Sequence, residues 1–231
     1  MTRAWETVDG VATARGRLEL RRRADGDFLI ALAGRVLMNS RQSRSEEALG
    51  RLAAELACER APVPRVLIGG LGMGCTLRAA LDALPAGARV AVAELTERIV
   101  DWCRGPLAPV SSGAVLDPRV AIEIVDVAAR IARAAASPDE RFDAIALDLD
   151  EGPHHGRGAR QHPVYGERAL RTTARALTPG GAFVLWSEHR DAGFEARLRG
   201  AGMTFEIRRP GRGGLRHAVY VARARSGGGR R

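Results

Sequence analysis

Glycines and carboxylates follow apolar runs at regular intervals in the middle of the chain. Residues 66–76 read Val66-Leu-Ile-Gly-Gly-Leu-Gly-Met-Gly-Cys-Thr76, and a second apolar run ends about 20 residues later at Glu94. Glycines have no Cβ, so the backbone can turn sharply there and approach a ligand closely. A carboxylate after the next strand can accept hydrogen bonds from both hydroxyls of a ribose. The layout is typical of a nucleotide-binding βαβ unit.

The glycine spacing narrows the class of ligand. The loop reads Gly70-x-Gly72-x-Gly74 rather than G-x-G-x-x-G, and a pyrophosphate is best held by free N–H groups at a glycine-rich helix N-terminus. The spacing therefore favours a nucleoside without phosphates, of which S-adenosylmethionine is the commonest. We expect Gly70, Gly72, Gly74 and Glu94 to contact it. The alternative is a glycine-rich turn that binds nothing.

Two further apolar runs also end in carboxylates. Asp126 follows Ile122-Glu-Ile-Val, and Asp148 follows Phe142-Asp-Ala-Ile-Ala-Leu147. Ligands of open α/β sheets bind beyond the carboxyl ends of the strands. Asp126 is therefore placed to accept from an adenine amino group, or to cap the following helix.

The Asp148 segment is the candidate reacting centre. Asp148 could take a proton from an attacking amine, or hold that amine in place, and such general-base help is worth ~100- to 10,000-fold. Asp150 adds negative charge that suits a cationic substrate. The alternative is a solvated strand-end loop whose carboxylates cap the next helix.

Three histidines lie close to this segment, namely His154, His155 and His162. Their spacing is a weak metal signal because no cysteine joins them, so we predict no metal site. We instead expect residues 152–161 to form a flexible loop that covers the substrate. Tyr165 either closes the pocket, as a third catalytic candidate, or packs in the core.

These positions require alternating strands and helices. Such alternation predicts a mainly parallel sheet with helices on both faces, and a short connection near residue 210 predicts a final antiparallel hairpin. The fold class is therefore α/β, a seven-stranded Rossmann-like methyltransferase sheet with a small N-terminal β-hairpin region. We expect strands at 65–69, 89–94, 119–124, 142–148, 181–187, 203–209 and 216–222, and helices near 75–84, 96–104, 126–136, 163–177 and 191–200.

The ends of the chain differ from its centre. Residues 1–60 are predicted to form a β-meander, with strands at 17–21, 28–32 and 36–38, and a linking helix capped by Ser43 or Ser45. Residues 61–223 would form the nucleoside-binding domain, and the Arg/Gly-rich residues 224–231 a disordered tail.

Composition limits the cellular setting and the partners. The chain of 231 residues has a net charge of +9, and it contains arginine but no lysine. The absence of Lys indicates a coding bias toward Arg, so a nucleic-acid partner is unlikely on charge alone. No run approaches the ~20 apolar residues of a membrane span. The three cysteines lie far apart, which predicts reduced thiols and a cytoplasmic location.

With these residues identified, the chain resembles the spermidine synthase (polyamine aminopropyltransferase) family. Gly69-Gly-Leu-Gly-Met-Gly-Cys-Thr-Leu-Arg78 is similar to the family's Gly-Gly-Gly-Asp-Gly-Gly-Thr-Leu-Arg loop. Further similar segments are Val92-Ala-Glu94, Asp117-Pro-Arg119, Asp126, Phe142-Asp143 with Asp148, and Leu177-Thr-Pro-Gly-Gly181. The resemblance implies a methyltransferase-like fold and S-adenosylmethionine or its decarboxylated form as cofactor.

The departures from the family pattern concern the amino end of the donor and the acceptor. Met73 stands where the family has an aspartate that helps bind the amino end of decarboxylated S-adenosylmethionine, so it is a further cofactor-binding candidate. The family's Tyr-His pair corresponds roughly to Ser45-Glu46, and its hairpin glutamine falls near Val36 or Leu37. We therefore predict a transferase that moves a methyl or aminopropyl group to a small-molecule or peptide amine other than putrescine, in a possible homodimer. The alternative is a non-catalytic nucleoside- or nucleic-acid-binding module that uses the Arg-rich surface.

Overall fold

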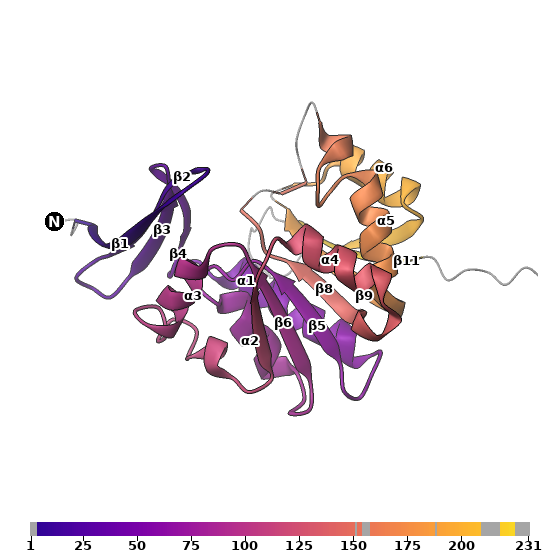
Figure 1. Cartoon of the computed structure of the whole chain (residues 1–231), viewed down its shortest axis with the longest axis horizontal. Coiled ribbons are helices and arrows are strands. Elements are labelled where there is room, and N and C mark those ends of the chain that lie inside the picture. Colours follow the sequence, from indigo (N-terminus) through magenta and orange to yellow (C-terminus); the bar gives the residue numbers. More distant parts are fainter. Residues whose placement is uncertain (1–3, 151, 154–157, 188, 209–217, 225–231) are drawn as a thin grey trace, which may run out of the picture.

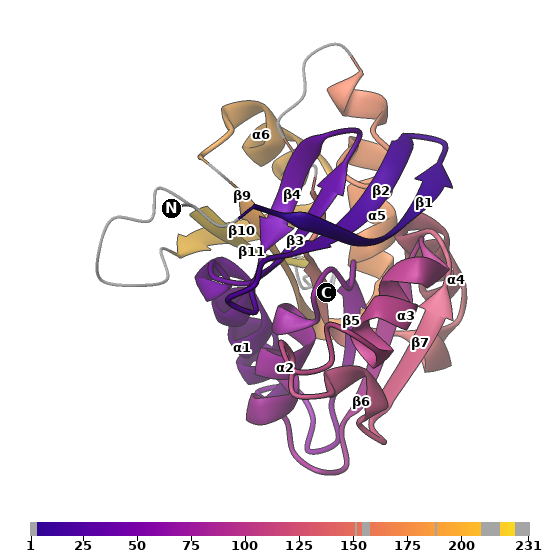
Figure 2. The same cartoon turned by 90° about the vertical axis from the view of Figure 1, so that its left-hand side faces the viewer.

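The computed structural model describes residues 4–150, 152–153, 158–187, 189–208 and 218–224. It contains a four-stranded antiparallel sheet at the N-terminus and a seven-stranded mixed sheet in the rest of the chain. Figure 1 shows the N-terminal sheet beside the main α/β body, and Figure 2 shows the same sheet from its broad side. The predicted fold class is confirmed.

The N-terminal sheet has the order β1-β2-β3-β4. Its strands are β1 (Glu6–Thr13), β2 (Gly16–Arg22), β3 (Phe28–Leu32) and β4 (Arg35–Asn39). Sequence analysis did not place β1, because its side chains are mostly exposed or half-buried and show no clean alternation. Helix α1 (Arg44–Cys58) follows, with Ser43 as its N-cap residue.

The main sheet has the order β10-β11-β9-β8-β5-β6-β7. Strand β11 runs antiparallel to both of its neighbours, whereas the other neighbouring pairs are parallel. The predicted sheet with one reversed strand is thus confirmed; the residues near 210 that connect its last two strands lie outside those described. The strands are β5 (Arg65–Gly69), β6 (Arg89–Glu94), β7 (Val120–Ile124), β8 (Phe142–Leu147), β9 (Leu177–Ser187), β10 (Met203–Arg208) and β11 (Ala218–Ala224).

Helices cover both faces of this sheet. One apolar cluster packs α1, α2 (Cys75–Ala83) and α3 (Glu97–Arg104) against it, together with the N-terminal sheet. The other packs α4 (Val127–Ala136), α5 (Glu167–Ala176) and α6 (Ala192–Gly200). Alternate residues of a strand point to opposite faces; accordingly Val66 and Ile68 enter the first cluster and Leu67 the second. Among the described residues, no helix is long and apolar enough to cross a membrane.

Two predicted boundaries are wrong. Helix α5 begins at Glu167 rather than near 163, because His162 Nδ1 accepts the backbone N–H groups of Val164 and Tyr165 and closes a turn there. Strand β9 begins at Leu177 rather than 181. Residues 178–181 form an irregular stretch of this strand, where the pairing with β8 shifts register.

Candidate active site

A cleft of about 1670 Å³ lies where the N-terminal sheet meets the carboxyl ends of the main strands. Its walls come from β1–β4, the start of α1, the glycine loop after β5, and the segments after β6, β7 and β8. The strand ends that the sequence singled out therefore converge on one space. Gly70, Gly72, Glu94, Asp126 and Asp148 all line it.

The glycine loop fits closely under its neighbours. Gly70 has φ +89°, and a Cβ there would overlap the carbonyl oxygen of Asp148. Gly72 has φ +53°, and its Cβ would lie 2.6 Å from Cε of Met38, which reaches over the loop from β4. Left-handed backbone and close contact both require glycine at these two positions.

The two other loop candidates have different surroundings. Gly74, at φ +83°, is the N-cap residue of α2. Met73 is only 3% exposed, and its side chain belongs to the apolar core. Neither is among the described residues that line the cleft. The Met73 side chain therefore lies away from the space in which the sequence analysis placed a ligand.

Glu94 joins two loops at the floor of the cleft. Its Oε2 accepts the backbone N–H of Leu71 at 2.9 Å, and its Oε1 accepts that of Thr96 at 2.9 Å. Burial raises the pKa of this carboxyl despite these bonds. Each carboxylate oxygen has a second acceptor site, so Glu94 keeps capacity for ribose hydroxyls while it fixes the glycine loop.

Asp126 caps the helix that follows it. Its Oδ1 accepts the backbone N–H of Ala129 at 3.1 Å, and it is the N-cap residue of α4. The side chain is exposed and lines the cleft. The capping interpretation thus holds, and the second carboxylate oxygen is left to accept from a ligand.

Asp148 stands at the tip of β8 in a desolvated position. The Thr76 hydroxyl donates to its Oδ2 at 2.6 Å, and the Trp186 side chain also hydrogen-bonds it. Burial is the main cause that raises its pKa from 3.8 to about 6, with a further increase from the nearby Glu46 carboxylate. At neutral pH Asp148 is therefore mostly ionised, yet it takes up a proton readily. These are the properties of a general base.

Asp150 has a different environment from the one predicted. Arg15 Nη2 donates to its Oδ2 at 2.9 Å, and Arg35 Nη2 donates to the same oxygen at 3.2 Å. These arginines come from the β1–β2 turn and from β4, so the two ion pairs connect the N-terminal sheet to the segment after β8. Asp150 lines the cleft, but its charge is already balanced.

Tyr165 is largely buried. It is 2% exposed, stacks on His162 with ring centroids 4.9 Å apart, and meets Phe194 edge-on. The ring therefore packs in the core and also forms part of the cleft wall. His154 and His155 lie outside the described residues, and within those residues no cluster of His, Cys, Asp or Glu could hold a metal ion.

Sequence analysis missed several side chains in and around the cleft. Trp186 lies inside a strand with no polar pattern around it. Arg197 sits on α6, 9% exposed, and donates to the carbonyl oxygens of Tyr165 and Pro153. No local signal distinguishes it from the many other arginines. The alignment of Ser45-Glu46 with the family's Tyr-His pair did locate a wall of the cleft, since both residues line it.

Comparison with known proteins agrees with this architecture. No protein-family model matches the chain. It is 33% identical over 122 residues to the polyamine aminopropyltransferases of Mycobacterium tuberculosis and Mycobacterium bovis, a match that covers 52% of this chain and 22% of each relative. The chain thus spans much less than the full length of these curated relatives.

Solved structures show the same fold over most of the chain. Spermidine synthase from Thermotoga maritima aligns with a TM-score of 0.69 at 20% identity, covering 95% of this chain and 73% of that one. A spermidine synthase in complex with the transition-state analogue AdoDATO aligns with a TM-score of 0.67 at 20% identity, over 95% and 72% of the two chains. Human methyltransferase-like protein 13 in complex with SAH gives 0.55 at 22% identity, over 80% and 82%. The chain is therefore similar in sequence to polyamine aminopropyltransferases over about half of its length, and it has a methyltransferase-like fold that the spermidine synthases share.

Proposed function

We propose that this protein is a group transferase that uses S-adenosylmethionine or its decarboxylated form to alkylate an amine. The observation that carries the proposal is the desolvated Asp148, which opens into the same cleft as Glu94, Asp126 and the glycine loop. The names of the relatives, polyamine aminopropyltransferase and spermidine synthase, support the same class of reaction.

The residues present fit such a nucleoside. Gly70 and Gly72 allow the loop to lie close to it, Glu94 offers acceptor sites for the ribose, and Asp126 offers one for the adenine amino group. The acidic character of the strand ends also suits a positively charged sulfonium compound. The buried Met73 offers no charge to the amino end of the donor. Calorimetry with both sulfonium compounds therefore decides which of the two is the donor.

The chemistry divides between the donor and the chain. When bound, the sulfonium compound supplies an electrophilic carbon: the amine lone pair forms the new C–N bond, the C–S bond breaks, and its electron pair leaves on sulfur. Asp148 holds the amine and accepts its proton, and its pKa of about 6 keeps it ionised at neutral pH. Thr76 and Trp186 fix the direction of that carboxylate. Orientation of this kind is itself a large catalytic factor.

Calorimetry tests the donor half directly. We expect one of the two sulfonium compounds to bind the full chain. Glu94→Gln should weaken this binding, because a glutamine side chain has a single acceptor oxygen and cannot accept the backbone N–H groups of both Leu71 and Thr96 as the two carboxylate oxygens do. The exposed Glu55→Gln on α1 is the matched control. Failure of both compounds to bind would overturn the proposal. The homodimer and the cytoplasmic location remain predictions.

The Arg-rich surface does not favour the alternative of a nucleic-acid-binding module. Carboxylates pair with many of the described arginines; for example, Arg119 binds Asp117 at 2.8 Å, and Arg130 binds Glu123 at 2.9 Å. Paired arginines contribute little positive potential to a surface.

A further inference from the structure

The acceptor end of the cleft has acidic and basic groups at different depths. Asp148 is half-buried at the inner end, where the Glu46 carboxylate is close enough to influence it. Arg15, Arg41 and Arg44 line the same cleft and are exposed at its mouth. One ammonium group is therefore favoured beside Asp148, whereas the exposed charged residues that the N-terminal sheet and the start of α1 contribute to the cleft are arginines.

A second ammonium group finds little to bind on the side of the cleft formed by the N-terminal sheet. Asp150 is the exposed carboxylate on that side, and Arg15 and Arg35 both bind its Oδ2, at 2.9 and 3.2 Å. The other exposed carboxylates that line the cleft follow β6 and β7, on the proposed donor side; they are Glu97, Asp101 and Asp126. A diamine would have to displace these two arginines, or place its second charge beside them. Like charges close together are unfavourable even in a solvated site.

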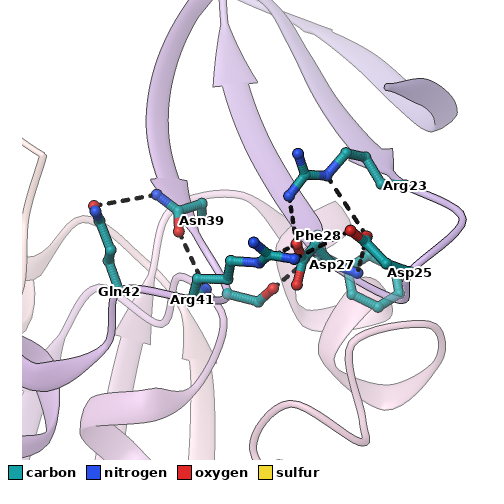
Figure 3. A network of polar contacts seen from close by, with 8 residues as sticks. Arg23, Asp25, Asp27, Phe28, Asn39, Arg41 and Gln42 are labelled. Atoms are coloured by element: carbon teal, nitrogen blue, oxygen red, sulfur yellow. Dashed lines mark hydrogen bonds and ion pairs between the residues drawn. The ribbon is translucent and has the colours of Figure 1, made fainter. Parts of the chain in front are cut away.

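Arg44 differs from the other arginines that line the cleft. Arg41 lies against Asp25 and Asp27, in the network of Figure 3 that also joins Asn39 to Gln42. Arg98, on α3, pairs with Asp9 and Asp101. Arg44 has no carboxylate partner among the described residues, although it is two positions from Glu46 and shares its cleft. A ligand can supply the missing negative charge.

We propose that the acceptor is an amine with an anionic group at its other end, such as an ω-amino acid, and not a diamine. Its ammonium group lies between Asp148 and Glu46, and its carboxylate or phosphate group pairs with the Arg44 guanidinium. This inference rests on the proposed function, because it names the acceptor class of the same transfer and adds no further covalent step.

The test uses the full chain saturated with whichever sulfonium donor binds by calorimetry. Donor turnover is followed as release of the nucleoside thioether, with series of ω-amino acids, n-alkylamines and α,ω-diamines of three to six carbons. We expect kcat/KM to rank ω-amino acid above alkylamine above diamine at equal length. The kcat/KM of the ω-amino acid should exceed that of the alkylamine about fivefold, which is the upper range for the contribution of an exposed ion pair.

Two variants identify the source of the preference. Arg44→Ala should reduce kcat/KM for the ω-amino acid to the value for the alkylamine, whereas the exposed Arg51→Ala on the same helix should keep the wild-type preference. The double variant Arg15→Ala/Arg35→Ala should raise kcat/KM for the diamine, because Asp150 then has no arginine bound to it and can pair with the second ammonium group. The proposal is overturned if diamines lead, if Arg44→Ala keeps the preference, or if no amine reacts although the donor binds. Absence of donor binding would instead remove the proposed function itself.

Discussion

Asp148→Asn separates the contributions of one carboxylate to stability and to catalysis. The folded protein raises the pKa of Asp148 from 3.8 to about 6. Between these two pH values the folded state keeps a proton that the unfolded chain releases, so stability falls as the pH rises. Above pH 6 the accumulated loss is about 3 kcal/mol at most. Asparagine does not ionise, so the stability of the variant should not fall between pH 4 and pH 6 for this reason.

The local structure can accept the asparagine. Its Oδ1 can receive the Trp186 hydrogen bond while its amide donates to Thr76 Oγ1, whose hydroxyl then turns to the Glu46 carbonyl oxygen, now 3.2 Å away. Any change in these contacts is the same at every pH. The difference between the two proteins across the pH range therefore isolates the ionisation of Asp148.

The assay is urea unfolding of both proteins at pH 4.0 and 7.5. From pH 4.0 to pH 7.5, we expect the free energy of unfolding of the variant to rise by about 2–3 kcal/mol relative to that of the wild type. The exposed Asp139→Asn control should show no such relative change. At neutral pH the variant should also lose ~100- to 10,000-fold in kcat, and wild-type turnover should fall as the pH drops through 6. Parallel stability profiles for wild type and variant would refute the reasoning.

Three other substitutions probe the parts that hold the cleft together. Gly70→Ala should destabilise the fold by about 2–4 kcal/mol in urea unfolding, because left-handed strain adds to a clash with Asp148; Gly113→Ala, with φ +66° and open space around its Cβ, should cost only about 1 kcal/mol. Glu94→Gln should lower stability by about 1–3 kcal/mol, since one of its two backbone N–H partners loses its acceptor. Arg197→Met should raise KM more than it lowers kcat, because the carbonyl oxygens of Tyr165, in the cleft wall, and of Pro153 lose their donor; an unchanged KM would show that these two hydrogen bonds do not hold the cleft in its binding shape.

The convergence of the strand-end carboxylates on one cleft was predictable because its signals are local. Each strand of the parallel sheet is a short apolar run, and the first polar residue after it lies at the carboxyl edge. Glu94, Asp126 and Asp148 follow this rule, and the structure places all three in the cleft. Met73 does not line the cleft for a related reason: the pattern identifies a loop position but not the direction of its side chain, which here enters the core.

The acceptor half depends on contacts between distant parts of the chain. Arg15 and Asp150 are 135 residues apart, and Arg35 and Asp150 are 115 apart. In a chain with so many arginines, nothing near these positions indicates which arginine meets which carboxylate. The pairing depends on where the N-terminal sheet packs, which follows from contacts such as the hydrogen bond that Trp102 Nε1 donates to Asp9 Oδ2 at 2.8 Å.

On the proposed function, this division would let the fold keep its donor while the acceptor changes. The main sheet fixes the strand ends through its own hydrogen bonds, and substitutions there disturb the whole domain. The acceptor wall is formed by the N-terminal sheet and the first turn of α1, whose arginines are exposed. Exchanging an exposed charge usually changes stability by less than about 0.5 kcal/mol, yet at the mouth of a cleft it reverses which ligand charge is favoured. On the proposed function, the charges around Asp150 and Arg44 therefore decide which acceptor this protein takes.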